Sequence, residues 1–90
     1  MSHTSHAKQA LLKRVRRIAG QVAALEKALQ ADEDCGKVLV QMAAAKGAMQ
    51  GLMMEVLAGQ ISGHLADEAD AERRRQEAQA LVKLLQTHLK

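Results

Sequence analysis

The chain has 90 residues, enough for one domain, and carries a formal net charge of +3 at pH 7. It contains no proline and no aromatic residue, and good helix formers dominate, which predicts an all-α fold and excludes a strand-rich one. The missing aromatic side chains also exclude a platform on which bases of a single-stranded nucleic acid would stack.

The composition also bears on location and assembly. No apolar run approaches the roughly 20 residues of a membrane span, and the N-terminus is too polar for a signal peptide, so we expect a cytoplasmic protein without membrane contact. The single cysteine, Cys35, cannot form a disulfide within the chain. A chain this short buries only about 60–65% of its unfolded surface, so we expect a homo-oligomer.

The positive charge is concentrated in the first third of the chain. Residues 1–30 carry six lysines or arginines against one acid, whereas residues 31–63 carry two against four, and residues 64–90 are balanced at five each. An anionic partner is therefore expected to dock on the first third.

Residues 1–6 are polar and without periodicity, which predicts a mobile arm, and a first helix is predicted over about residues 7–30. Its apolar residues alternate four and three apart, as in an amphipathic helix: Leu11, Val15, Ile18, Val22, Leu25 and Leu29. Its other side carries a basic cluster with Gln21 near it: Lys13, Arg14, Arg16 and Arg17. The cluster is either a solvated face or a phosphate-binding surface, and spacing alone leaves both interpretations open.

A second helix is predicted over about residues 35–62, and Asp32 or Asp34 is expected to cap its start. Its apolar stripe again alternates four and three apart: Val38, Met42, Ala45, Met49, Leu52 and Val56. Small residues on and around its other side would let a second backbone come close: Ala44, Gly47, Ala48 and Gly51. Gly63 is expected to act as its C-cap, and a third helix is predicted over about residues 71–89 after an acidic linker.

Residues with ligating or nucleophilic side chains lie at the two ends of the second helix. Cys35 begins it, where the helix dipole favours the thiolate, and Gln60 and His64 share one face near its end. At about 1.5 Å per residue, Cys35 and His64 would lie roughly 40 Å apart in one unbroken helix. An antiparallel copy of the helix from a second subunit is therefore needed to bring them together. No motif of an enzyme active site is present, so we do not expect an enzyme.

Three features of the chain form a pattern in combination: the motif R-x-R-R-I-x-G-Q-V over residues 14–22, Cys35, and the glycine- and methionine-containing run over residues 43–56. Together they resemble the CsoR/RcnR family of bacterial repressors over nearly the whole chain. The resemblance implies a three-helix protomer that forms antiparallel dimers and a disc-shaped homotetramer, a dimer of dimers. It also implies that the basic faces bind double-stranded operator DNA and that an effector at the subunit interface weakens this binding.

The resemblance assigns sensing roles to four positions: His3, Cys35, Gln60 and His64. It also makes the N-terminal amine of Ser2 a possible further ligand. The nickel- and cobalt-sensing RcnR branch is similar at three of these positions but has histidine in place of Gln60. An amide oxygen is a poor ligand for borderline metals, so Gln60 is the weakest member of the set. Nickel or cobalt is the expected effector, with zinc in a four-coordinate site as an alternative metal.

The formaldehyde-sensing FrmR branch supplies a second effector hypothesis, because its first helix resembles this one closely. There Cys35 would attack the carbonyl carbon and the amine of Ser2 would capture it, without a metal cofactor. The copper-sensing CsoR branch has cysteine at the position of His64, so Cu(I) is not expected. The predicted DNA contacts are Lys13, Arg14, Arg16, Arg17, Gln21 and Lys46. A helical interaction module without any DNA role is the alternative from another class.

Overall fold

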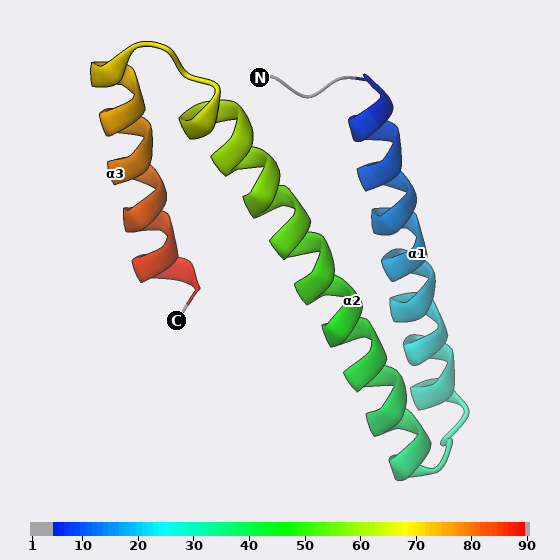
Figure 1. The fold of residues 1–90 in the computed structure, drawn as a ribbon. Coiled ribbons are helices and arrows are strands. Elements are labelled where there is room, and N and C mark those ends of the chain that lie inside the picture. The colour runs from blue at the N-terminus through cyan, green and yellow to red at the C-terminus, as the bar shows by residue number, and fades with distance from the viewer. Residues whose placement is uncertain (1–4, 90) are drawn as a thin grey trace. The chain divides into compact units, whose positions relative to one another are not determined.

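The computed structural model describes residues 5–89, and this part of the chain contains three α-helices, one π-helical segment and no strand. The helices are α1 (Ser5–Gln30), α2 (Cys35–Ile61) and α3 (Ala71–His88), and the π-helical segment η1 (Ser62–Ala66) follows α2 directly (Figure 1). The predicted all-α fold of three helices is therefore confirmed. The described residues divide into two compact units, a hairpin unit over residues 5–56 and a C-terminal unit over residues 57–89.

The helix bounds lie within two residues of the predicted ones, and the differences have local causes. α1 begins at Ser5, two residues before the predicted start, so residues 5 and 6 of the predicted arm are helical. Serine and histidine do not break a helix, and the amphipathic run that follows continues it. Residues 1–4 of the predicted arm lie outside the described residues. The predicted C-cap at Gly63 is wrong, since no described glycine has a positive φ. The chain instead passes into η1, where Asp67 N donates to Ser62 O at 3.0 Å in the five-residue spacing of a π-helix.

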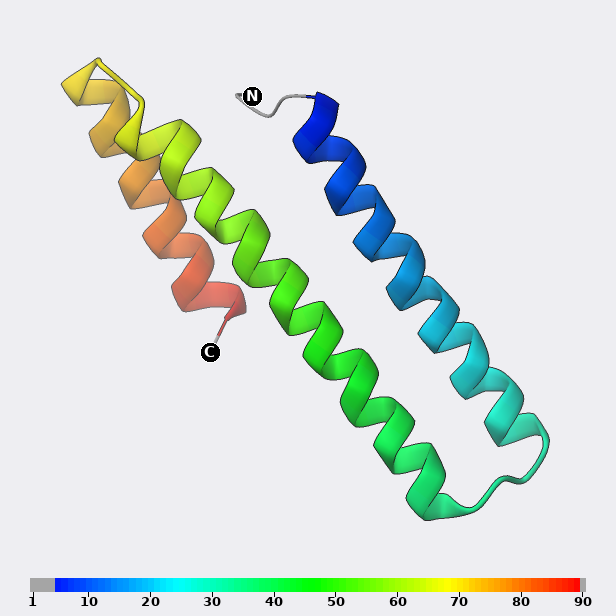
Figure 2. The same ribbon diagram turned by 45° about the vertical axis from the view of Figure 1, so that its right-hand side comes forward.

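In the hairpin unit α1 and α2 run antiparallel, joined by residues 31–34 (Figures 1 and 2). Asp32 has a φ of 56°, the left-handed conformation that commonly follows the end of a helix. Asp34 caps α2, because its Oδ2 accepts hydrogen bonds from the backbone N–H groups of Gly36 at 3.1 Å and Lys37 at 3.4 Å. Of the two predicted caps, Asp34 is the one used.

The face that α1 presents to α2 differs from the predicted apolar stripe. The buried hydrophobic residues of the described chain are few: Ile18, Ala28 and Val38. Half-buried residues of the hairpin unit extend the same face: Leu11, Arg14, Gln21 and Leu25 on α1, with Ala45, Ala48, Gly51 and Leu52 on α2. Val15, Val22 and Leu29 of the predicted stripe are instead 47%, 52% and 59% exposed. The small residues of α2 thus approach α1, and the larger branched residues of α1 remain uncovered.

The protomer leaves much more apolar surface exposed than a stable monomer would. On α2, Met42, Met49 and Val56 are each close to half exposed, in addition to the three residues of α1. Burial of so few side chains does not offset the conformational entropy that long helices lose when they become ordered. The exposed apolar side chains are therefore expected to be covered by another protein surface. None of the described helices combines the length and the apolar run needed to cross a lipid bilayer.

In the C-terminal unit, η1 packs against α3. The acidic linker orders the turn between them, because Asp70 Oδ2 accepts the backbone N–H of Arg73 at 3.1 Å and so caps α3. The backbone oxygen of Glu68 accepts a hydrogen bond from Arg74 Nη1 at 2.7 Å. The linker therefore positions η1, and with it His64, beside the first turns of α3.

Candidate functional site

The exposed basic face of α1 is the strongest candidate for binding an anion. Lys13, Arg16 and Arg17 are exposed, and the ion pairs of the described residues involve none of them. Lys13 and Arg16 also line a shallow groove of about 260 Å³ together with Gln9 and Ala10. Three cations outside these ion pairs, within two turns of one rigid helix, form a surface to which DNA phosphates can bind.

Arg14 differs from the other members of the basic cluster because it lies against α2. Its Nη1 donates to Glu55 Oε2 at 2.6 Å, with 37% of the Arg14 side chain and 50% of the Glu55 side chain exposed. A Cβ added to Gly51 would lie 2.8 Å from Arg14 Nη2, so the guanidinium rests directly over the glycine. No role for Glu55 was predicted from the sequence. The available signal was that Glu55 is the single acid in α2.

Gln21 and Lys46, the other predicted DNA contacts, differ from the exposed basic residues of α1 in burial or in the helix that carries them. Gln21 is half-buried on the side of α1 that faces α2, and its Oε1 is buried without a hydrogen-bond partner among the described residues. Lys46 is exposed on α2, next to Ala45 but outside the half-buried face. The structure therefore places Lys13, Arg16 and Arg17 together on exposed turns of α1, whereas the DNA contacts of Gln21 and Lys46 stay predictions.

The candidate effector residues lie at the two ends of α2. Cys35 is its first residue, and its thiol is free and exposed. Gln60 is half-buried in the last turn of α2, and His64 follows within η1. The imidazole Nδ1 of His64 lies 3.8 Å from Glu77 Oε2 of α3, with 30% of the histidine side chain exposed. The predicted ligands Ser2 and His3 lie outside the described residues.

The donor types suit nickel, cobalt or zinc, since thiolate and imidazole are ligands that these metals accept. However, the 27 residues of α2 amount to about 40 Å of helix, with Cys35 at its beginning and His64 beyond its end. Within the described part of the chain, no group of three or more His, Cys, Asp or Glu side chains is placed to hold a metal ion. A complete ligand set therefore requires residues from a second protomer or from the N-terminal segment.

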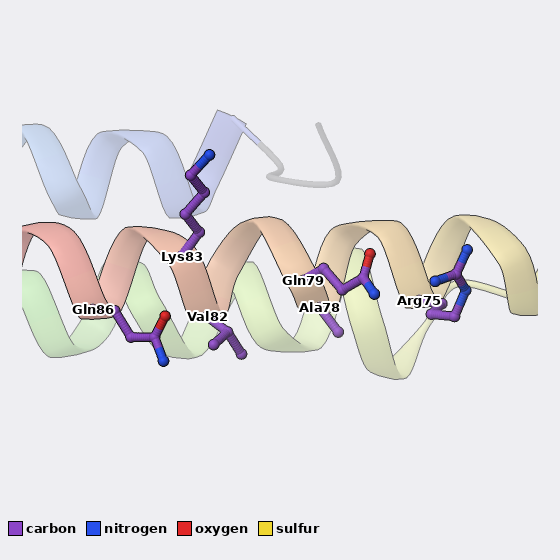
Figure 3. A pocket seen from close by; sticks show the side chains of 6 residues that line it. All are labelled: Arg75, Ala78, Gln79, Val82, Lys83 and Gln86. Atoms are coloured by element: carbon purple, nitrogen blue, oxygen red, sulfur yellow. The ribbon is translucent and has the colours of Figure 1, made fainter.

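A shallow groove of about 570 Å³ on α3 is lined by none of the predicted site residues (Figure 3). Its lining comes from one helix alone: Arg75, Ala78, Gln79, Val82, Lys83 and Gln86. Arg75 binds Glu72 through two hydrogen bonds of 2.6 and 3.2 Å, which lower the pKa of the Glu72 carboxyl below its ordinary value of 4.5.

Comparisons with known proteins identify the family of the chain. A sequence model described as metal-sensitive transcriptional repressor matches residues 7–87. The chain belongs to this family. The transcriptional repressor RcnR of Salmonella typhimurium is 41% identical over 90 residues, and a Serratia marcescens protein described by its place in the bioA 5′ region is 45% identical over 91 residues. Both alignments cover 100% of each chain.

A solved structure is also similar to this repressor. It is a glutamate-to-histidine variant of FrmR, described as a formaldehyde-responsive regulator, from Salmonella enterica serovar Typhimurium. The TM-score is 0.89 at 38% identity, and the match covers 96% of this chain and 98% of that one. The family resemblance expected from the sequence is confirmed, as is the expectation that the protein is a transcriptional regulator and not an enzyme.

Proposed function

We propose that the protein represses transcription by binding a specific double-stranded operator through α1 and that an effector acting at Cys35 releases it. The exposed cations Lys13, Arg16 and Arg17, in a chain of the repressor family, carry this proposal. The repressor acts as a dimer of dimers in the bacterial cytoplasm, where operator DNA is found. The apolar side chains left uncovered on α1 and α2 support assembly, because a second protomer can bury them.

The proposed effector is a transition-metal ion: nickel or cobalt, or zinc in a four-coordinate site. Cys35 of one protomer and His64 of a second protomer would be its ligands, with Ser2 and His3 from an N-terminal segment and Gln60 as the weakest donor. Thiolate and imidazole suit these ions, and the exposed position of Cys35 leaves its sulfur accessible. Ligation would fix the position of α2 relative to α1, and a tenfold loss of DNA affinity requires only about 1.4 kcal/mol of coupling.

Formaldehyde is the second candidate effector, and the free, exposed thiol of Cys35 and the similarity to FrmR favour it. The thiolate adds to the carbonyl carbon and gives a hemithioacetal after protonation of the oxygen. The N-terminal amine of Ser2 then displaces that oxygen as water, leaving an S–CH₂–N bridge and a mass increase of about 12 Da per bridge. Intact mass spectrometry distinguishes this outcome from stoichiometric metal uptake.

Fluorescence anisotropy with DNA from upstream of the gene tests the proposal. We expect binding that weakens steeply with salt, and release when Ni(II), Co(II), Zn(II) or formaldehyde is added in separate titrations. Arg16→Ala and Arg17→Ala should each weaken binding, whereas the matched control Lys83→Ala on α3 should not. If no DNA fragment binds even at low salt, the chain is instead a helical interaction module.

A further inference from the structure

The ion pair between Arg14 and Glu55 joins the basic helix to α2 within the hairpin unit. Both side chains are at least a third exposed, and such surface pairs contribute little to folding stability. The 2.6 Å distance nevertheless defines one orientation for a long side chain with several rotatable bonds. Its principal consequence is therefore where the guanidinium lies, not how stable the hairpin is.

We propose that Glu55 is a positioning residue for DNA binding: it holds the Arg14 guanidinium against α2 in the orientation that contacts a DNA phosphate. This inference rests on the proposed operator binding. A guanidinium has five N–H donors, and the bond to Glu55 engages only one of them at Nη1, so Arg14 can bind Glu55 and a phosphate oxygen together. A guanidinium that is already ordered loses less conformational entropy when it binds DNA.

Gly51 is the third part of this arrangement. The Arg14 Nη2 atom lies 2.8 Å from where a Cβ of residue 51 would be, so any larger residue must displace the guanidinium. Gly47, one turn earlier on α2, has nothing within 4 Å of the corresponding position. Glycine at position 51 therefore allows the close approach that brings Arg14 within reach of Glu55.

The arrangement also links DNA affinity to the position of α2. Glu55 and Gly51 belong to the helix that begins at Cys35, whereas Arg14 belongs to the helix that carries the basic face. A displacement of α2 along α1 would move the carboxylate away from the guanidinium or carry the guanidinium with it. Effector binding at Cys35 can therefore reach the DNA-binding face through this ion pair.

Glu55→Gln tests the inference because two explanations predict opposite signs. Removing a negative charge beside a DNA-binding face should strengthen binding if only long-range electrostatics matter. If Glu55 positions Arg14, binding should instead weaken by up to roughly tenfold, because the neutral amide accepts a weaker hydrogen bond than the carboxylate and holds the guanidinium less firmly. The slope of log K against log salt should also become shallower by about 0.9 for each phosphate that the protein no longer neutralises. Glu33→Gln, which removes the same charge from the loop of the hairpin unit, is the matched control.

Two further variants separate a positioning role from a general loss of structure. In an Arg14→Ala background, Glu55→Gln should have no additional effect on DNA affinity. Gly51→Ala should weaken DNA binding while Gly47→Ala does not, although both substitutions raise helix propensity. Circular dichroism and sedimentation should show unchanged helix content and assembly in each variant.

The possible results distinguish failure of the inference about Glu55 from failure of the proposed repressor function. If wild-type protein binds the operator and Glu55→Gln binds it as well or more tightly, the inference is wrong while the repressor function stands. If wild-type protein binds no DNA, the repressor function fails and the inference with it. Restricted rotation of the Arg14 guanidinium, observed by NMR without DNA and absent in Glu55→Gln, would then still establish the ion pair itself.

Discussion

Replacing Val22 tests whether the uncovered apolar face of α1 is where protomers assemble. Val22 is 52% exposed, and Val15 and Leu29, two turns away on either side, are 47% and 59% exposed. Val22→Ala removes two carbon groups, each contributing about 0.8 kcal/mol when fully buried. Because roughly half of the side chain would become newly buried on assembly, the free energy of association should weaken by about 0.8 kcal/mol per protomer. A twofold-symmetric interface contains both copies, which gives about 1.6 kcal/mol, or roughly a 15-fold weaker dimer.

Sedimentation equilibrium over a concentration series measures this change. Val22→Asp should prevent assembly altogether, because an unpaired carboxylate cannot be buried without a large desolvation cost. Lys27→Ala is the control, since Lys27 is exposed on the same helix outside the apolar face. Assembly of Val22→Asp with wild-type affinity would refute the assignment of this face to the interface.

Cys35→Ser should retain operator binding and lose release by metal ions and by formaldehyde, as measured by anisotropy with and without each effector. Asp34→Ala should destabilise the protein by about 1 kcal/mol through loss of the α2 cap, as measured by chemical denaturation. Glu72 should titrate with a pKa below 4.5 by NMR, and Arg75→Gln should raise its pKa toward that value. Because the folded pKa of Glu72 is the lower one, the ion pair contributes stability above the unfolded pKa and loses it as pH falls through the folded pKa.

Each of these results has a contrary outcome. Release of Cys35→Ser by an effector would place the sensor elsewhere in the chain. Asp34→Asn can still accept the capping hydrogen bonds, so an equal loss of stability in Asp34→Asn and Asp34→Ala would exclude the cap as the cause. A Glu72 pKa that Arg75→Gln leaves unchanged would show that Arg75 does not stabilise the carboxylate.

Local rules were enough to predict the helices, since each depends on neighbours in the sequence. The alternation of apolar residues and the absence of proline predicted three helices, and Asp34 was among the predicted caps. The end of α2 was harder, because Gly63 suits a C-cap and is also tolerated inside a π-helical segment. In the structure Gly63 lies inside the π-helical segment η1, and this segment packs against α3. The conformational freedom of glycine does not by itself indicate that packing.

The sequence predicted the basic cluster as one group, whereas the structure shows that one of its members forms an ion pair with α2. Periodicity placed the cluster on α1 but did not separate Arg14, which forms an ion pair with Glu55 of α2, from Arg16 and Arg17, which are exposed and take part in none of the ion pairs of the described residues. The two partners Arg14 and Glu55 are 41 residues apart in the chain, and no local pattern relates them. The position of Gln21 on the side facing α2 was likewise not evident from the sequence.

The sequence by itself determined the helical class, the concentration of positive charge in the first helix and the family. The tertiary structure decided which side of each helix is covered: small residues of α2 face α1, while Val15, Val22 and Leu29 stay exposed. The physical reason is that apolar periodicity states how much surface a helix must bury but not which neighbour buries it. That choice depends on where two backbones can approach closely, as at Gly51 beneath Arg14, and this is visible only in the folded chain.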